Sequence, residues 1–287
     1  MNLCLRMRVE GFGKVWCNMA LADKIASKNK DKRNQNLMGL IKRMHSVVET
    51  DDIDRHRQSQ DNFGAIFGAS KDITYADFKI EEMDAEWSRV NRVHMKKYVV
   101  LYCHGGGYMT GSLKYARCLT GKLASSTSMD VLAFDYRLAP EHPYPAALED
   151  AMKAWNYLML LGYGARDVIV GGDSAGGNLA LALVLKLKEE DRILPRGIFL
   201  MSPWTDLTVS GKSHQTKADI DPVLNAEYLK EAIDSYAKDE DLQNPLISPL
   251  FGEFKGFPPV YIQTGDNEIL LDDATMLHKK LVRENVS

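Results

Sequence analysis

The stretch that most constrains the fold is 168–178, which reads Val-Ile-Val-Gly-Gly-Asp-Ser-Ala-Gly-Gly-Asn. Its apolar first half predicts a buried strand, its glycines a sharp turn, and the apolar run 178–188 a buried helix. Ser174 stands in a Gly-x-Ser-x-Gly pattern, whose glycines let strand and helix approach closely and lift the serine hydroxyl above the sheet. Ser174 is therefore a candidate nucleophile. The alternatives are a tight turn with an incidental serine and a glycine loop that binds phosphate.

A second glycine-rich segment lies earlier in the chain. The apolar run 98–103 predicts a strand, and His104 and the glycines of 105–107 follow it directly. Backbone N–H groups at consecutive glycines are open to an anion, which suits a tetrahedral intermediate of acyl transfer. A glycine hinge after a strand is the alternative for this loop alone. Because a loop of this kind is the usual oxyanion partner of the Gly-x-Ser-x-Gly turn, the two motifs in this order indicate a hydrolase site.

Alternating polar and apolar residues at 73–80 and 86–93 predict a strand pair with one wet face. Five continuous apolar runs, separated by helical segments, predict a parallel sheet with helices on both faces. These runs are 98–103, 130–135, 167–171, 196–201 and 259–264, and the helices are expected at 117–126, 146–161, 179–190 and 272–284. Ligand sites of such sheets gather at the carboxyl ends of the strands, where Ser174 and Gly106 both fall.

Four motifs resemble those of the hormone-sensitive-lipase-like α/β-hydrolases, also called bacterial family IV esterases. They are 104–107, 135–143 (Asp-Tyr-Arg-Leu-Ala-Pro-Glu-His-Pro), 172–178 and 202–207 (Ser-Pro-Trp-Thr-Asp-Leu), and the likeness extends from about residue 77 to the last residue. The resemblance implies an α/β-hydrolase fold with a mostly parallel sheet and a helical cap. It also implies cleavage of short-chain acyl or acetyl esters through an acyl-enzyme, with no cofactor and no metal. The implied oxyanion donors are the backbone N–H groups of Gly106, Gly107 and Ala175.

The same resemblance implies a triad acid soon after the strand at 259–264. The family usually has an aspartate before a Pro-Leu-x-Asp turn, and the aligned residue here is Glu268, in Glu-Ile-Leu-Leu-Asp. Asp266 is the competitor two residues earlier. Either carboxylate could orient an imidazole. We favour Glu268, and we expect the other acid to cap or complement the following helix.

The histidine of the triad is harder to place. Triad order in this fold is serine, acid, histidine, and only His278 follows Glu268. His278 falls inside the predicted helix 272–284, whereas the family's histidine comes about 30 residues past the acid, after one more strand. We therefore expect His278 to be an exposed helix residue, and the sequence as given to be cut short, without the last strand and the general base, and nearly inactive. Of the other histidines, two are expected to be structural and four have no motif: His104 and His142, and His45, His56, His94 and His214.

Two segments are expected to lie over the site. Residues 1–60 are predicted to be helical and, by the resemblance, to form cap helices on a core of 61–287. Residues 206–244 break the strand and helix rhythm and contain a predicted helix at 225–236, so they form either a lid or a surface excursion. Tyr108, Trp204 and Leu207 are candidates for the substrate pocket. Core packing is the alternative for each.

Charge and cysteine content narrow the partners. A formal net charge of −3 gives no electrostatic case for nucleic acid. Charged residues interrupt 1–20, which excludes a signal peptide and stable membrane insertion by this segment. Cys4, Cys17, Cys103 and Cys118 lack the spacing of a zinc or redox motif, which favours reduced thiols in a cytoplasmic protein. The expected partner is a small ester. A homodimer through an edge strand is common in the family and is possible here, but removal of the last strand would expose a new sheet edge and favour aggregation instead.

Two other functions stay open. The first is a small-molecule binding protein on a degenerate hydrolase scaffold, as in the plant gibberellin receptors, which resemble this family and lack its catalytic histidine. The intact Ser174 and oxyanion glycines argue against it. The second is an acetyl-sugar deacetylase, which shares the mechanism and differs in the shape of its pocket.

Overall fold

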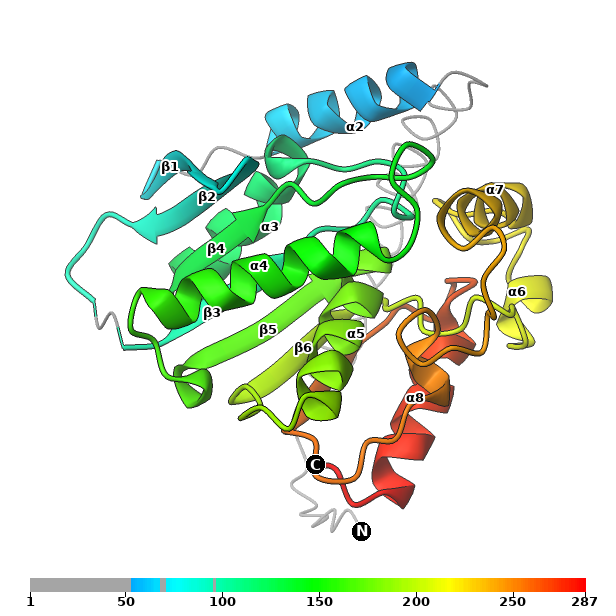
Figure 1. Cartoon of the computed structure of the whole chain (residues 1–287). Helices are drawn as coiled ribbons and strands as arrows, with labels where there is room; N and C mark the ends of the chain where they lie inside the picture. Colours follow the sequence, from blue (N-terminus) through cyan, green and yellow to red (C-terminus); the bar gives the residue numbers. More distant parts are fainter. Residues whose placement is uncertain (1–52, 68–70, 95–96) are drawn as a thin grey trace, which may run out of the picture. The chain divides into compact units, whose positions relative to one another are not determined.

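All seven predicted strands pair into a single mixed sheet in the computed structural model (Figure 1). The order of strands across the sheet is β1-β2-β4-β3-β5-β6-β7. The strand pair at the edge is antiparallel, and the five continuous apolar runs form the parallel part, as predicted. The bounds are β1 (Ile73–Ile80), β2 (Met83–Val90), β3 (Val99–Cys103), β4 (Asp130–Phe134), β5 (Val168–Asp173), β6 (Gly197–Met201) and β7 (Val260–Gln263).

The structure describes residues 53–67, 71–94 and 97–287. Of the cap helices expected in 1–60, only the part within α2 (Ile53–Phe67) lies among these residues. The other helices are α3 (Leu113–Thr127), α4 (Ala146–Leu160), α5 (Ala175–Glu189), α6 (Ser213–Thr216), α7 (Ala226–Tyr236) and α8 (Leu271–Arg283), with short 3-10 turns η1 (Ala165–Asp167) and η2 (Pro249–Phe251). In the part of the chain that is described, no helix has the length and apolar character needed to cross a membrane.

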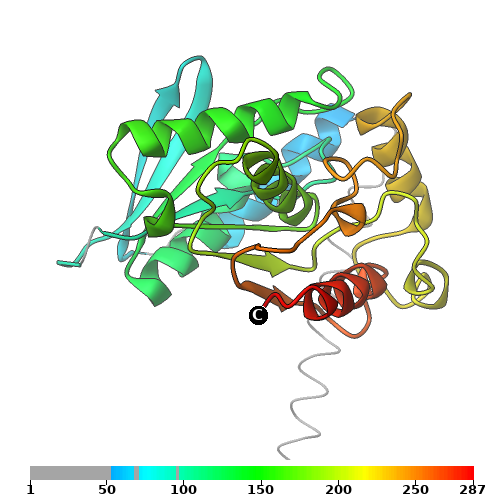
Figure 2. The same ribbon diagram turned by 60° about the horizontal axis from the view of Figure 1, so that its bottom comes forward.

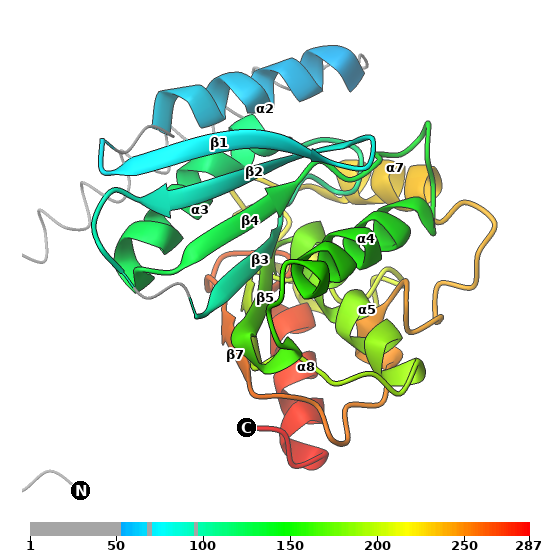
Figure 3. The same cartoon turned by 60° about the vertical axis from the view of Figure 1, so that its left-hand side comes forward.

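Helices cover both faces of the sheet (Figure 3). One core contains side chains of α4, α5 and α8, and a separate core lies under α3 on the opposite face. Strand β3 contributes to both, because successive side chains of a strand point to opposite faces. Leu101 and Cys103 pack on the α5 side, and Val100 and Tyr102 on the α3 side. A strand buried on both faces has no polar positions, which explains the continuous apolar run.

Four predicted boundaries were wrong by three or more residues: both ends of β2, which ends at Val90 rather than 93, and the starts of α3 and α5. Strand β2 begins at Met83 rather than 86, because a two-residue turn with Glu81 in the left-handed region (φ 55°) joins it to β1. Helix α3 begins at Leu113 rather than 117, because the Ser112 hydroxyl accepts from the N–H groups of Lys114 and Tyr115. Helix α5 begins at Ala175, immediately after Ser174.

The segment between β6 and β7 contains α6, α7 and η2, and α7 matches the helix predicted at 225–236. Asn225 caps α7 through a hydrogen bond from the Tyr228 N–H (2.8 Å). Figure 2 shows the first part of this segment, drawn in yellow, at the amino end of α8. We call residues 205–224 the insertion.

Candidate active site

Ser174 occupies a strained turn between β5 and α5. Its φ of 53° and ψ of −120° lie in a region that ordinary residues avoid, at a cost of about 1–3 kcal/mol. The Ser174 N–H donates to the Met201 carbonyl (3.0 Å), which fixes the turn against β6. A Cβ atom at Gly176 would overlap the carbonyl oxygens of Cys103 and His104, so only glycine fits there. The half-buried Ser174 hydroxyl caps no N–H group of α5 and remains available for chemistry.

The loop after β3 presents free backbone donors. Gly106 (φ 125°) and Gly107 (φ 62°) both lie in the left-handed region. The Gly106 carbonyl accepts from the Thr110 N–H and the Thr110 hydroxyl, both at 2.9 Å. Because a trans peptide directs its C=O and N–H to opposite sides, the Gly107 N–H points away from Thr110. Within the described residues no hydrogen bond uses the N–H of Gly106, Gly107 or Ala175.

The carboxylate of Asp173 ties the serine turn to this loop. Its Oδ1 accepts from the Gly105 N–H (2.9 Å) and the Tyr102 hydroxyl (2.6 Å), and its Oδ2 accepts from the Tyr115 hydroxyl (3.0 Å). Burial raises the pKa of Asp173, and the three donors act against that shift by stabilising the charged form. The residue before Ser174 therefore sets where the glycine loop after β3 begins.

His104 lies beneath the loop and is structural, as predicted. The ring Nδ1 is 2.8 Å from the Gly105 carbonyl, the ring stacks on Tyr136 with centroids 4.2 Å apart, and the side chain is 1% exposed. Burial lowers the pKa of His104 to about 4. The imidazole is therefore neutral at physiological pH.

Of the two candidate acids, Glu268 is the one with fixed geometry. Its Oε1 accepts from the Gly265 N–H (2.9 Å), and the Thr264 hydroxyl donates to its Oε2 (3.3 Å). Asp266 is exposed and makes no hydrogen bond within the described residues. Both residues follow β7 at the carboxyl edge of the sheet, which is also where Ser174 stands. These contacts support Glu268.

No imidazole hydrogen-bonds the Ser174 hydroxyl in the part of the chain that the structure describes. His278 is on the exposed face of α8, where the sequence predicted it. His214 is buried and its Nε2 lies 2.7 Å from the Asp273 Oδ2. His94 contacts Asp130 at the opposite end of the sheet, and His56 lies with its ring centroid 5.6 Å from that of Tyr228.

The three pocket candidates are buried. Tyr108 is 1% exposed, donates to the Asn178 Oδ1 (2.7 Å) and stacks on Tyr236 with centroids 3.7 Å apart. Trp204 is 1% exposed and Leu207 is fully buried. The Tyr108 hydroxyl finds its partner inside the protein, in the first turn of α5. Burial thus favours core packing for all three residues, the alternative that the sequence left open.

No sequence pattern pointed to Tyr228, which belongs to α7 and borders the glycine loop after β3. A Cβ atom added to Gly107 would lie 2.5 Å from the Tyr228 hydroxyl. Burial raises the pKa of Tyr228 to about 12, so its hydroxyl keeps its proton at neutral pH. Helical periodicity shows which face of a helix is buried, but it cannot show that one tyrosine meets a loop more than a hundred residues earlier.

In the described residues, no group of three or more histidine, cysteine or acidic side chains could hold a metal ion.

Comparisons with known proteins agree with the fold. A family model for the alpha/beta hydrolase fold matches residues 100–287. An esterase of Acinetobacter venetianus is 39% identical over 216 residues, which are 75% of this chain and 69% of that protein. An acetyl-hydrolase of Streptomyces hygroscopicus is 38% identical over 199 residues, 69% of this chain and 66% of that protein. A crystal structure of an esterase from the bacterial hormone-sensitive lipase family superimposes with a TM-score of 0.83 at 33% identity, covering 88% of this chain and 84% of that one.

Proposed function

The chain belongs to the hormone-sensitive-lipase-like esterases of the α/β-hydrolase fold, and we propose that it cleaves short-chain carboxylic esters with Ser174 as the nucleophile. The main support for the proposal is that two kinds of polar group with no structural role occur together, a serine hydroxyl and a set of backbone N–H groups. The Ser174 hydroxyl makes no helix cap, and the neighbouring N–H groups of Gly106, Gly107 and Ala175 bond to nothing within the described residues. A protein with no use for these groups would gain stability by satisfying them.

The reaction proceeds in two halves. The Ser174 oxygen bonds to the acyl carbon as its proton passes to a base, and the carbonyl oxygen becomes an oxyanion that the three N–H groups stabilise. Collapse of this intermediate expels the alcohol, which takes up the proton, and leaves the acyl group on Ser174. Water then attacks in the same way, releasing the acid and restoring the serine. One oxyanion donor of this kind is worth about 3–4 kcal/mol of barrier.

Glu268 would hold the base in its working orientation and stabilise its charged form. No histidine among the described residues bonds to Ser174, so we propose that this chain turns over slowly. Loss of the base leaves an acceleration over water of about 10³ to 10⁴ from the oxyanion hole and binding. Imidazole added to the solution can enter such a site and act as the base.

Short acyl groups are the proposed substrates, and acetyl esters are included. The Streptomyces relative is an acetyl-hydrolase, and the Tyr228 hydroxyl narrows the space in front of Gly107. We further propose a cytoplasmic protein, because Cys103 is a buried free thiol and Cys118 a half-buried one. Assembly into a homodimer also remains a proposal.

A non-catalytic binding protein on the same scaffold is the second candidate, because no described imidazole bonds to Ser174. Hydrolysis of p-nitrophenyl acetate, with and without added imidazole, distinguishes the two. We expect a slow rate that imidazole raises and that Ser174→Ala abolishes, after subtraction of hydrolysis by imidazole itself. Equal rates for the chain and Ser174→Ala at every imidazole concentration would favour the binding protein.

A further inference from the structure

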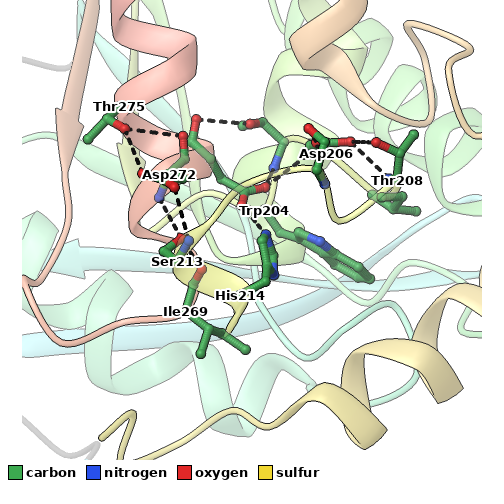
Figure 4. A network of polar contacts seen from close by, with 12 residues as sticks. Trp204, Asp206, Thr208, Ser213, His214, Ile269, Asp272 and Thr275 are labelled. Atoms are coloured by element: carbon green, nitrogen blue, oxygen red, sulfur yellow. Dashed lines mark hydrogen bonds and ion pairs between the residues drawn. The ribbon is translucent and has the colours of Figure 1, made fainter. Parts of the chain in front are cut away.

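The insertion is fastened to the turn that carries Glu268 (Figure 4). The Ser213 hydroxyl donates to the Ile269 carbonyl (2.6 Å) and accepts from the Asp272 N–H (2.9 Å). The Ser213 N–H donates to the Asp272 Oδ2 (2.9 Å). The Asp221 Oδ2 accepts from the Ile269 N–H (2.7 Å). Both backbone groups of Ile269, the residue directly after Glu268, are therefore held by the insertion.

A second set of contacts fixes the end of the same turn. The Asp273 Oδ1 accepts from the N–H groups of Thr205 (2.8 Å) and Asp206 (2.9 Å), and its Oδ2 lies 2.7 Å from the His214 Nε2. Asp273 is 1% exposed and His214 is 5% exposed. Removal of either end of a buried pair leaves the other without its partner, so this set locks the insertion in place.

We propose that Ser213 is a positioning residue for Glu268, which rests on the proposed role of Glu268 in ester hydrolysis. Ser213 is 3% exposed, so water does not replace its hydroxyl when the hydroxyl is removed. The Ile269 carbonyl and the Asp272 N–H would then lose their partners together, and the turn between them would loosen. Because the Glu268 carboxylate accepts from the Gly265 N–H across this turn, that hydrogen bond reports the position of the acid.

It follows that the first part of the segment between β6 and β7 is not a moving lid. Residues 205–221 form a fixed brace of the acid-bearing turn. Any opening over the site would involve α7, which follows Asp221 and carries Tyr228.

Hydrogen exchange of single amides, measured by NMR, tests the proposal without any need for turnover. In Ser213→Ala we expect the amides of Asp272 and Gly265 to exchange about tenfold faster, and Ser213→Thr, which keeps the hydroxyl, to restore both. Ser248→Ala is the matched control, since Ser248 is also a buried serine that accepts from a backbone N–H, that of Leu207, and does not touch the turn. Faster exchange at Asp272 with no change at Gly265 would overturn the proposal.

The imidazole-assisted rate gives a second readout and separates this proposal from the proposed function. We expect Ser213→Ala to need several times more imidazole than the unaltered chain for half of its maximal Ser174-dependent rate, because a loosened Glu268 orients imidazole poorly. Ser248→Ala should leave that concentration unchanged. An unchanged concentration in Ser213→Ala would contradict the role of Ser213 even if the chain is an esterase. If the unaltered chain has no Ser174-dependent rate, the esterase function fails, and the exchange at Gly265 still decides whether Ser213 positions Glu268.

Discussion

The Asp173 carboxylate accepts a hydrogen bond of 2.9 Å from the Gly105 N–H. This contact joins the residue before Ser174 to the first glycine of the loop after β3, 68 residues earlier in the chain. The two motifs seen in the sequence are thus coupled by a carboxylate that belongs to one and binds the other. The Tyr102 and Tyr115 hydroxyls also donate hydrogen bonds to the Asp173 carboxylate, so the carboxylate is held in one orientation.

Asp173→Asn tests this coupling. The asparagine side chain has the same size as aspartate but no charge. One of its two polar atoms is an NH2 donor, which would face the N–H and O–H donors that bind the carboxylate. Hydrogen bonds to charged groups contribute about 1.5–3 kcal/mol, so we expect the Ser174-dependent rate to fall about tenfold or more. The rate is measured with p-nitrophenyl acetate and imidazole. Asp167→Asn, in η1 directly before β5, is the control and should be nearly neutral. Equal rates for the two variants would mean that Asp173 does not set the loop.

Gly176→Ala should destabilise the fold strongly. The added methyl group would overlap backbone oxygens of Cys103 and His104, which cannot move without breaking the sheet. We expect a loss of at least about 3 kcal/mol in the free energy of unfolding, measured with urea. Gly197→Ala is the control, since its methyl group would meet only the Pro259 carbonyl oxygen, at an ordinary 3.4 Å. A Gly176→Ala protein as stable as Gly197→Ala would contradict the close approach of α5 and β3.

Much of the fold follows from local pattern. The parallel strands were predictable because burial on both faces leaves each one a continuous apolar run, and the serine turn because its glycines are required sterically. The start of β2 was not, because the turn at Glu81 adopts a left-handed φ without a glycine to mark it.

The candidate site also contains residues that the sequence could predict and residues that it could not. Ser174 and the loop glycines were found by motif, and Glu268 by alignment to the family. The contacts of Ser213 and Tyr228 were not predictable, because a serine that bonds to a distant turn, or a tyrosine that lies against a distant loop, leaves no periodic signal. Tyr108, Trp204 and Leu207 lie near the motifs in the sequence, yet nearness along the chain does not distinguish a pocket wall from the core beneath it.

Tyr228→Phe should slow the reaction with little loss of stability. The change removes only the hydroxyl beside Gly107, whose N–H is a proposed oxyanion donor. We expect a Ser174-dependent rate lower by roughly threefold to tenfold and a melting temperature close to that of the unaltered chain. The control is Tyr261→Phe, at a residue that is 65% exposed on β7. If Tyr228→Phe matched this control in rate, α7 would have no part in the site.

His104 should make stability depend on pH. Its folded-state pKa of about 4 lies below the ordinary value of 6.5, so the unfolded chain binds a proton that the folded chain does not. Stability from this group is complete above pH 6.5 and is lost as the pH falls towards 4, by about 3 kcal/mol in all. Burial raises the pKa of Asp135 to about 6, which acts in the opposite direction. Comparison with His104→Gln isolates the histidine.

The unaltered chain should have the larger free energy of unfolding at pH 7. We expect its difference from His104→Gln to shrink as the pH is lowered from 7 to 4. NMR titration of the His104 ring should give the same pKa directly. A difference that stays constant over this range would show that His104 is not buried in its neutral form.

If Ser174 is a nucleophile facing an oxyanion hole, it should carry the acyl group during the reaction, and the mass of the intact protein would reveal that group. After mixing with p-nitrophenyl acetate and brief exposure to imidazole, we expect one acetyl group per chain, located by peptide mapping at Ser174 and absent from Ser174→Ala. We expect slow deacylation, because no histidine among the described residues bonds to Ser174, and the adduct should therefore accumulate. Acetylation confined to lysines, or equal in the chain and in Ser174→Ala, would show that Ser174 is not the nucleophile.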